Sequence, residues 1–553
     1  MARFKTRGYV CCALMLLCAL AIIIICMSVL LRKKCPDGTF SSVAVAADSG
    51  TCSRIGRDML KKGGSAVDGA IAALLCTSVI NPQSMGLGGG SIFTVMDSSG
   101  KVKIINSRET VPRNVRLDLL KTCPKSFQLI AGSKWIGVPG EIRGYEKAHE
   151  LYGKLPWATL FQPTIKLARE GFPIPVIQGR YISYTESNTT KPLRELYTDK
   201  NGNLMKTGDI VKFEKLADTM EMIANLGAEA FYSGKIAEDL IRDIQEAGGI
   251  LTVQDLASYK VTVTDAWVIP LGEYQMYIPP PPAGGVLLSF ILNVMKGYNL
   301  DSTSLIGEQK TLVYHRLLEA FKFSNGLKKY IRDPGFSSEK MAKKFTEDSF
   351  AEHIRSLINS SKAHDPHYYN ITPHLDNMGT THISVLGEDG LAVSVTSTIN
   401  NIFGSKVFSP STGVILNNQL SDFCGREDSI SPGQQPPSSM APAVLKSKSK
   451  TLVIGSTGGG MITAGMASAL INHLWFGKSL KDAIAAPIVY VRPENVVGFE
   501  QNFDENVIKD LVAMGHTHKA MARFYNVVNA VEKEDGCICA VSDARKLGEP
   551  AGY

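Results

Sequence analysis

Two adjacent threonines behind a glycine are the side chains of this sequence best suited to nucleophilic chemistry. Gly379, Thr380 and Thr381 open the stretch "GTTHISVLGEDGLAVSVTST". A threonine hydroxyl needs a base, and the α-amine of a chain that begins with threonine can serve, because its reference pKa is about 7.7 to 8.0. This chemistry requires cleavage before Thr380, and a glycine lets the hydroxyl reach the preceding carbonyl. The simpler interpretation is that these residues merely begin a strand.

The residues that follow must position these hydroxyls. Apolar and polar residues alternate along this stretch, which predicts a hairpin of two half-buried strands. A two-residue loop would pair Gly387 with Gly390, put Thr380 opposite Ser397 and place Thr398 beside it. We therefore expect the glycine-led threonine to meet a second cluster of hydroxyls.

A glycine-rich loop is the second element with chemical potential. It joins "TLVIG", which predicts a strand, to "MITAGMASALINHLWFG", which predicts a helix. Gly458 and Gly459 would then lie where backbone N–H groups converge at a helix N-terminus, and such groups stabilise the oxyanion of acyl transfer. The spacing is not that of a dinucleotide-binding motif, and tight strand–helix packing remains the alternative use of these glycines.

The histidines suggest no further reaction. No serine lies in a G-x-S-x-G motif, and no His-x-x-x-His or Cys-x-x-Cys pair indicates catalytic zinc. We expect His516 and His518 to lie at the surface. His382 follows the threonine pair, but adjacent strand residues face opposite sides, so we expect a structural role for it.

The composition is that of an ordinary globular protein. Of 553 residues, 44% are hydrophobic and 20% charged, and the net charge is +7. Lys and Arg are spread along the chain and form no basic stripe with interleaved aromatic residues, so we do not expect a nucleic-acid partner.

The N-terminal region contains an apolar run of 23 uncharged residues, 9–31. A bilayer requires about 20, and a signal peptide has a core of only about 7 to 15, so we expect an uncleaved transmembrane signal-anchor. Three basic residues precede the run and three follow it, so charge does not decide its orientation.

Glycosylation patterns favour a body outside the cell. The N-x-Ser/Thr pattern occurs at Asn188, Asn359 and Asn370. We therefore predict a single-pass type II protein of the plasma membrane, with residues 1–8 in the cytoplasm. A cytosolic body with reduced cysteines is the competing hypothesis.

Seven of the eleven cysteines lie outside the apolar run. Because seven is odd, at least one should stay free or pair with another molecule. Cys52 and Cys76 flank a predicted helical hairpin whose second helix opens with a Ser65-x-x-Asp68 capping pattern, and we predict a disulfide between them. We expect one or two bridges at most. The unassigned cysteines are Cys35, Cys123, Cys424, Cys537 and Cys539.

From about Val43 to its last residues, the chain resembles the gamma-glutamyltransferases, or glutathione hydrolases. The signatures include "GGSAVDGAIAALLC", "INSRE", "GTTHISV", "TSTIN", "LNNQLSDF", "PPSSM" and "SDARKLGEPAGY". The resemblance implies an α/β fold, an αββα four-layer sandwich of the N-terminal-nucleophile hydrolase type. It also implies autocatalytic cleavage between Gly379 and Thr380 into a large subunit, 32–379, and a small catalytic subunit, 380–553, that form a heterodimer.

The resemblance implies a role for each site residue. Thr380 would be the nucleophile, Thr398 its hydrogen-bond partner, and Gly458 and Gly459 the oxyanion hole, with Thr398 and Gly459 also touching substrate. A guanidinium suits a carboxylate, so Arg108 would hold the α-carboxylate. Gln419 stands where relatives often have Glu, but it keeps an acceptor. Ser438 and Ser439 would assist Arg108, and Asn400, Gln419 and Asp422 would hold the α-ammonium.

The implied substrates are glutathione, its S-conjugates and leukotriene C4. Thr380 would form a γ-glutamyl ester that water, an amino acid or a dipeptide then cleaves. No metal or organic cofactor is implied. Two alternatives remain: an acylase of the same fold acting on another amide, and an uncleaved inactive protein that serves only interactions.

Overall fold

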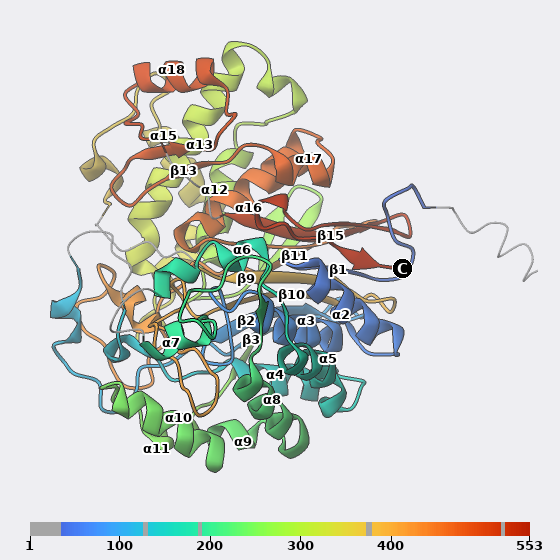
Figure 1. Cartoon of the computed structure of the whole chain (residues 1–553). Helices are drawn as coiled ribbons and strands as arrows, with labels where there is room; N and C mark the ends of the chain where they lie inside the picture. Colours follow the sequence, from blue (N-terminus) through green and yellow to red (C-terminus); the bar gives the residue numbers. More distant parts are fainter. Residues whose placement is uncertain (1–34, 125–130, 186–190, 372–378, 521–525) are drawn as a thin grey trace, which may run out of the picture.

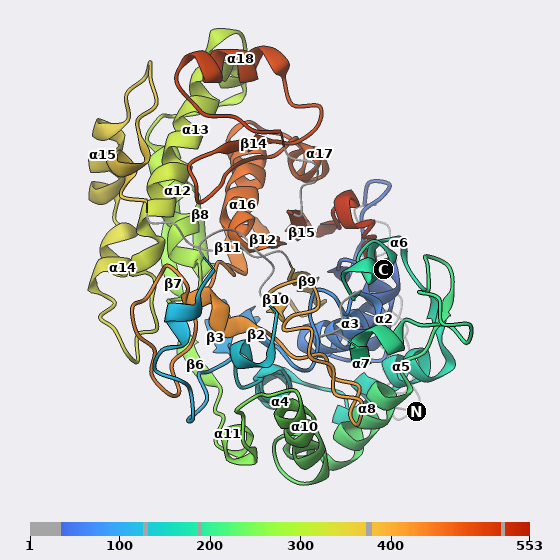
Figure 2. The ribbon, with the colours of Figure 1, turned by 60° about the vertical axis from the view of Figure 1, so that its left-hand side comes forward.

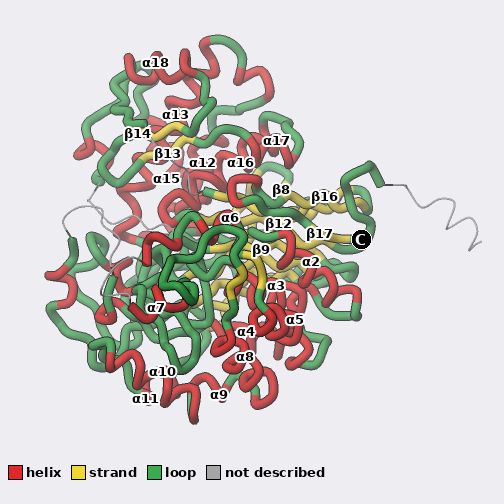
Figure 3. The backbone as a smooth tube through the Cα atoms, in the orientation of Figure 1, coloured by secondary structure: helices red, strands yellow, loops and turns green. Residues whose placement is uncertain are grey.

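Two β-sheets lie face to face at the centre of the molecule, with helices on both outer faces (Figure 1). The computed structural model describes residues 35–124, 131–185, 191–371, 379–520 and 526–553. Figure 3 shows the strands gathered between the two helical layers. The predicted order of helices, sheet, sheet and helices is therefore present in the described part of the chain.

The first sheet has seven strands in the order β17-β1-β9-β10-β2-β3-β6. Its neighbouring strands pair antiparallel. The strands are β1 (Ala44–Ala46), β2 (Gly90–Met96), β3 (Val102–Asn106), β6 (Thr262–Asp265), β9 (Thr381–Leu386), β10 (Ala392–Thr398) and β17 (Ala551–Gly552).

The second sheet has six strands in the order β16-β15-β12-β11-β8-β7. Its apolar side chains meet those of the first sheet in a buried cluster that includes Leu386, Val453 and Val531. The strands are β7 (Trp267–Leu271), β8 (Tyr274–Ile278), β11 (Ala443–Lys446), β12 (Lys450–Thr457), β15 (Val527–Glu534) and β16 (Cys537–Val541). Short pairs lie outside these sheets: β4 (Phe172–Pro173), β5 (Ile210–Val211), β13 (Val489–Val491) and β14 (Val497–Phe499).

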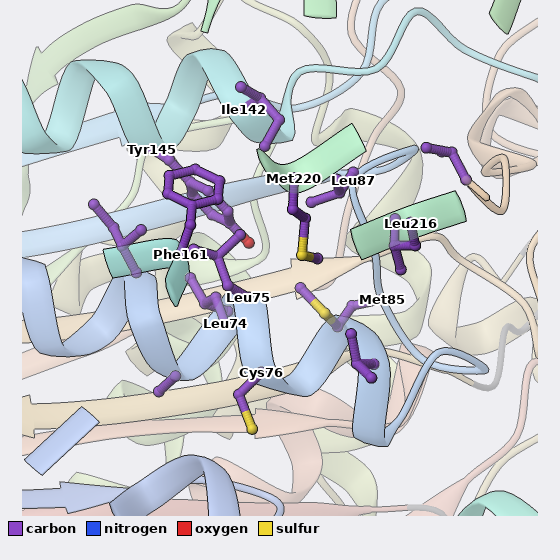
Figure 4. Packing of buried hydrophobic residues seen from close by; sticks show 14 of the residues in the cluster. Leu74, Leu75, Cys76, Met85, Leu87, Ile142, Tyr145, Phe161, Leu216 and Met220 are labelled. Carbon is purple, nitrogen blue, oxygen red and sulfur yellow. The ribbon is translucent and has the colours of Figure 1, made fainter. Parts of the chain in front are cut away.

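Helix α3 (Ala66–Ile80) is buried along its whole length beneath the first sheet. It is apolar on all sides, as expected for a helix enclosed by other elements. Figure 4 shows Leu74 and Leu75 of this helix among side chains from α4, α5 and α8. The helices of this half are α2 (Gly50–Lys61), α4 (Glu141–Tyr152), α5 (Trp157–Glu170), α6 (Val176–Gly179), α7 (Lys191–Leu196), α8 (Glu214–Leu226), α9 (Glu229–Tyr232), α10 (Lys235–Glu246) and α11 (Val253–Ala257).

The second sheet is covered by α12 (Gly285–Lys296) and α16 (Ile462–Leu470), which share its apolar core. Figure 2 shows these helices above β11 and β12, with α13 (Glu308–Leu327) alongside. The remaining helices of this half are α14 (Lys340–Phe345), α15 (Asp348–Leu357), α17 (Leu480–Ala485) and α18 (Glu505–Ala513).

Strands from before and after residue 380 are intermixed within the first sheet. Strand β1 lies between β17 and β9, and β10 lies between β9 and β2. In the second sheet β8 pairs with β11. The two halves of the chain therefore share both sheets.

The hairpin exists, but its predicted register is wrong by one residue. Thr381, not Thr380, lies opposite Ser397. The N–H of Gly387 donates to the carbonyl of Leu391, so the loop has three residues, and Gly390 takes φ +84° within it. A three-residue loop with glycine in the left-handed region is the next commonest hairpin after the two-residue loop.

The cysteines form more bridges than expected. Cys52–Cys76 is confirmed, and it joins α2 to α3, whose Ser65 and Asp68 form the predicted capping box. Two further disulfides overturn the expected limit of one or two bridges, because distant parts of the fold bring their cysteines together: Cys35–Cys537 and Cys123–Cys424. Cys539 is the one free cysteine among the described residues.

Three predictions concern the chain's environment. The run 9–31 and Asn188 lie outside the described residues, whereas Asn359 and Asn370 are exposed. Within the described ranges, no helix has both the length and the apolar character that a membrane span needs.

Candidate functional site

Thr380 is held by hydrogen bonds at three positions. Its N–H donates to the carbonyl of Ser84 at 3.0 Å, and its carbonyl accepts from Nζ of Lys546 at 2.7 Å. Its hydroxyl donates to Oγ1 of Thr398 at 3.0 Å. Its φ is +83°, a strained value for a β-branched residue, and such strain concentrates at functional sites.

Thr398 ends β10 and is fixed from two sides. Its Oγ1 also accepts from the N–H of Asn400 at 2.8 Å. A Cβ on Gly89 would lie 2.2 Å from the Thr398 carbonyl, so only glycine permits this approach. Gly88 and Gly90 also approach neighbouring backbone carbonyls closely, so these glycines serve close packing.

The support beneath Thr380 was missed in the sequence. Oδ2 of the buried Asp48 accepts from Nζ of Lys546 and from the hydroxyl of Thr381, both at 2.7 Å. Oδ1 of Asp48 accepts from the amide of Asn529 at 2.8 Å. Lys546 lies in "SDARKLGEPAGY", which was a family signature without an assigned chemical role.

The glycine-rich loop directs a backbone donor at the bond before Thr380. Gly458 and Gly459 take φ +104° and +60°, which favour glycine. The N–H of Gly458 donates to the carbonyl of Gly379 at 3.3 Å. The side-chain amide of Asn526 holds the loop by donating to the carbonyls of Thr457 and Met461 and to the hydroxyl of Ser456. This geometry agrees with the predicted oxyanion cradle.

Gly379 is itself constrained by its surroundings. A Cβ at this position would lie 2.2 Å from the carbonyl oxygen of Asn400. Because backbone cannot move aside as a flexible side chain can, any other residue would displace the Gly379–Thr380 bond.

Arg108 and Asp422 form a buried ion pair on another wall of the site. Nη2 of Arg108 lies 2.6 Å from Oδ2 of Asp422, and the two residues are 0% and 9% exposed. Arg108 also donates to the carbonyls of Pro436 and Pro437. Its Nη1 has no hydrogen-bond partner among the described residues. One cation and one anion so placed can receive the carboxylate and the ammonium of an amino-acid head group.

Polar residues around Asp422 complete this wall. The amide of Gln419 donates to Asp422 at 2.8 Å, which leaves its Oε1 buried without a partner in the described structure. The amide of Asn400 donates to the hydroxyl of Ser421 and to the carbonyl of Asn418. The unused Gln419 oxygen is the acceptor for which the family resemblance implies an ammonium.

One pocket gathers most of the predicted site. Its lining contains Arg108, Thr380, Thr398, Asn400, Gln419, Asp422, Ser438, Ser439 and Gly459. Gly458 lies outside this lining, and its N–H donates to Gly379. The lining also contains residues that the sequence did not single out: Arg426, Pro437, Met440, Gly460 and Ile462.

Most of the chain matches one enzyme family. A sequence model of the family described as "Gamma-glutamyltranspeptidase" matches residues 52–553. The chain belongs to the gamma-glutamyltranspeptidase family. It is 44% identical to the "Glutathione hydrolase 5 proenzyme" of Rattus norvegicus, over 98% of each chain. Membership makes this gamma-glutamyltranspeptidase an enzyme of γ-glutamyl hydrolysis or transfer.

Solved structures agree with the fold. The cephalosporin acylase of Bacillus halodurans superposes with a TM-score of 0.84 at 23% identity, covering 94% of this chain and 98% of that one. The gamma-glutamyltranspeptidase of Helicobacter pylori gives a TM-score of 0.53 at 25% identity, over 61% of this chain and 96% of that one.

This gamma-glutamyltranspeptidase contains two fully buried carboxyl groups, Glu109, which lies beside Arg108, and Glu141. Burial raises the pKa of Glu109 to about 8, although the charge of Arg108 opposes the shift. Burial likewise raises the pKa of Glu141 to about 8. Neither carboxyl is part of the pocket lining.

The interior histidines are structural. His382 lies between the sheets, bonded to the hydroxyls of Thr396 and Ser384, and burial lowers its pKa to about 3. His516 was wrongly predicted at the surface: it is 2% exposed and its Nε2 lies 2.8 Å from Nδ1 of His315. His518 is exposed as expected.

The two paired histidines and Glu319 are close enough to hold a metal ion. Tyr369 already donates to both Glu319 oxygens, and Nζ of Lys322 lies 3.2 Å from one of them. A second cation beside Lys322 would be repelled. We therefore assign no metal to this cluster.

Proposed function

We propose that this chain is a proenzyme that cleaves itself between Gly379 and Thr380 and then uses Thr380 to hydrolyse or transfer γ-glutamyl groups. One observation carries the proposal: the Gly458 N–H is bound to the Gly379 carbonyl while the Thr380 hydroxyl is oriented by Thr398. Nucleophile, electrophile and oxyanion donor thus meet at one peptide bond.

Cleavage would begin with attack of Thr380 Oγ1 on the carbonyl carbon of Gly379. The Gly458 N–H stabilises the oxyanion, and collapse of the intermediate breaks the C–N bond to give an ester and a free amine on Thr380. Water then hydrolyses the ester, releasing a carboxylate at Gly379 and restoring the Thr380 hydroxyl. The left-handed backbone of Thr380 favours this step, because cleavage relieves the strain.

Turnover would use the same hydroxyl with the new amine as its base. The Thr380 hydroxyl attacks the γ-carbonyl of the substrate and gives its proton to the α-amine of Thr380. That amine then protonates the leaving amine of the substrate, and a γ-glutamyl ester of Thr380 forms. Gly458 and Gly459 stabilise the oxyanion. Attack of water on this ester releases glutamate, and attack of an amino acid or dipeptide gives a new γ-glutamyl compound.

The ion pair supports recognition of a free amino-acid head group. A bound substrate would place its α-carboxylate on Arg108, with Ser438 and Ser439 beside it, and its α-ammonium on Asp422, Asn400 and Gln419. Every one of these contacts is to the glutamyl end. We therefore propose glutathione, its S-conjugates and leukotriene C4 as substrates, since they share that end.

The enzyme is proposed to be anchored in the plasma membrane by residues 9–31, with its body outside the cell. Three disulfides support this placement, because disulfides persist in oxidising compartments. The exposed Asn359 and Asn370 patterns agree with it.

A denaturing gel of the purified chain under reducing conditions tests self-cleavage. Wild type should give two fragments, and Thr380→Ala should give one band and no γ-glutamyl hydrolysis. Thr380→Ser is the matched control, because it keeps the hydroxyl and should still cleave. Two fragments from Thr380→Ala would reject the mechanism and favour processing by another protease, while an uncleaved wild type would favour the inactive interaction protein.

The second candidate is an acylase for another amide, which the close fold match to the cephalosporin acylase favours. Anilides of γ-glutamate, α-glutamate and glutarate separate the two, because glutarate lacks the α-ammonium. We expect turnover of the γ-glutamyl anilide alone, and equal rates on the glutaryl anilide would reject head-group recognition.

A further inference from the structure

We propose that the mature enzyme is a covalent heterodimer whose two subunits are joined by the disulfides Cys35–Cys537 and Cys123–Cys424. The inference rests on the proposed cleavage at Gly379. Each of these bridges spans that position, with sequence separations of 502 and 301 residues. Cys52–Cys76 spans only 24 residues and lies within the large subunit. Cleavage therefore converts two intrachain bridges into interchain bridges and leaves the third unchanged.

The first bridge ties the N-terminal end of the large subunit to the small subunit. Phe40 pairs with Ile538 next to the bridge, through N–H groups that donate in both directions at 2.8 Å. The N–H groups of Ser41 and Ser42 donate to the carbonyl of Tyr553. These backbone hydrogen bonds alone hold the segment after Cys35 along β16 and the C-terminus, and the disulfide adds a covalent link.

This position matters because the predicted membrane anchor ends at residue 31. Cys35 follows it by four residues. The small subunit carries Thr380 but contains no comparable apolar run of its own. The bridge would connect the anchor directly to the catalytic subunit, so loss of non-covalent contacts alone would not release that subunit from the membrane.

The second bridge lies beside the substrate site. Cys424 is two residues from Asp422 and packs with Phe423 and Trp135 in a small buried cluster, against which Cys123 also packs. The bridge holds the loop that carries Asp422 to the large subunit, which supplies Arg108. It therefore fixes the two halves of the head-group clamp relative to each other across the cleavage.

Both bridges form by ordinary thiol chemistry. Each pair of thiols passes two electrons and two protons to a disulfide donor of the secretory compartment through thiol–disulfide exchange. Cys539, two residues from Cys537, is left as the thiol. Burial and the nearby charge of Glu532 raise its pKa, which keeps it poorly reactive toward exchange.

The two subunits already share both sheets, so the bridges change how the dimer comes apart. Without a covalent link, unfolding releases two chains and its midpoint depends on protein concentration. With a link, unfolding is unimolecular and the Tm does not move with concentration. This gives a second measurement that does not depend on a gel.

The test is a full-length chain with different tags at its two ends, run on denaturing gels with and without reductant after free thiols are alkylated. We expect one band carrying both tags without reductant and two bands with it. Two bands on both gels would overturn the covalent link while leaving cleavage intact. One band on both gels would overturn the cleavage, and the interchain link with it.

Paired substitutions identify the bridges. Cys35→Ser with Cys537→Ser, or Cys123→Ser with Cys424→Ser, should each leave the subunits linked, because one bridge suffices. All four together should separate them without reductant and make the Tm rise with protein concentration. Cys52→Ser with Cys76→Ser is the matched control and should stay linked.

If the fourfold variant does not fold, mass spectrometry of unreduced wild-type peptides decides: cross-linked peptides joining Cys35 to Cys537 and Cys123 to Cys424 support the proposal, and their absence refutes it.

Discussion

The two walls of the pocket are built from opposite kinds of chemistry. At the Thr380 hydroxyl and the Gly379 carbonyl, the partners are neutral: the hydroxyl of Thr398 and the backbone N–H of Gly458. Around the head group they are a buried cation and anion, Arg108 and Asp422, in direct contact. Bond cleavage and substrate recognition are therefore separable in this site. The strained backbone of Thr380 serves bond cleavage, and the paired charges select the substrate. Self-cleavage should therefore need only the first wall, and substrate turnover both.

The largest effect confined to one wall is expected from Arg108→Gln. The change removes the cation that would hold the substrate's α-carboxylate, and loss of one partner of a buried charge pair costs about 2 to 5 kcal/mol of binding, so kcat/KM for a γ-glutamyl anilide should fall about a thousandfold. Self-cleavage should proceed, because Arg108 touches neither Gly379 nor Thr380. Arg116→Gln, at an exposed arginine, is the control. A variant that binds substrate well, or that fails to cleave although folded, would contradict the separation.

Thr398→Val should impair both reactions. Valine keeps the shape but removes the oxygen that orients the Thr380 hydroxyl, so both the self-cleavage rate and kcat should fall about a hundredfold, measured by gel densitometry and anilide hydrolysis. Thr398→Ser restores the oxygen and should retain most of each rate. Normal cleavage with lost turnover would place Thr398 on the recognition wall instead.

Lys546→Met tests the support beneath the nucleophile. It removes the hydrogen bond to the Thr380 carbonyl and leaves Asp48 without its cation, so we expect kcat to fall about tenfold and the Tm to drop, with KM unchanged. Lys509→Met, at an exposed lysine, should change neither. A change in KM alone would show that Lys546 acts on substrate binding.

The smallest effect concerns Glu109, the fully buried carboxyl beside Arg108. With its pKa raised to about 8, Glu109 keeps a proton in the folded state that the unfolded chain loses near pH 4.5, so stability should fall as pH rises between those values. Glu109→Gln should make the decline shallower by at most about 1.4 kcal/mol per pH unit, measured by urea unfolding between pH 5 and 8. An unchanged slope would show that Glu109 is ionised in the folded protein.

The sequence predicted local and chemical features well. Capping at Ser65 and the Cys52–Cys76 bridge follow from neighbouring residues, and the structure confirms both. The charged wall came from the family resemblance alone, since Arg108 and Asp422 lie far apart along the chain.

Features set by distant segments could not be predicted in the same way. The hairpin register turned on whether its loop had two or three residues, which both fit the glycines. The partners of Cys35 and Cys123, the burial of His516 and the contact of Lys546 with Thr380 all arise where distant strands meet. No local sequence pattern predicts contacts between such distant segments.

The central claim is that cleavage creates the base for the nucleophile, and the N-terminus of the small fragment tests it most directly. Edman sequencing should read Thr-Thr-His-Ile, beginning at Thr380 with a free α-amine, and acetylating that amine should abolish hydrolysis of a γ-glutamyl anilide. A different first residue, or a single uncut chain that still hydrolyses glutathione, would contradict the account.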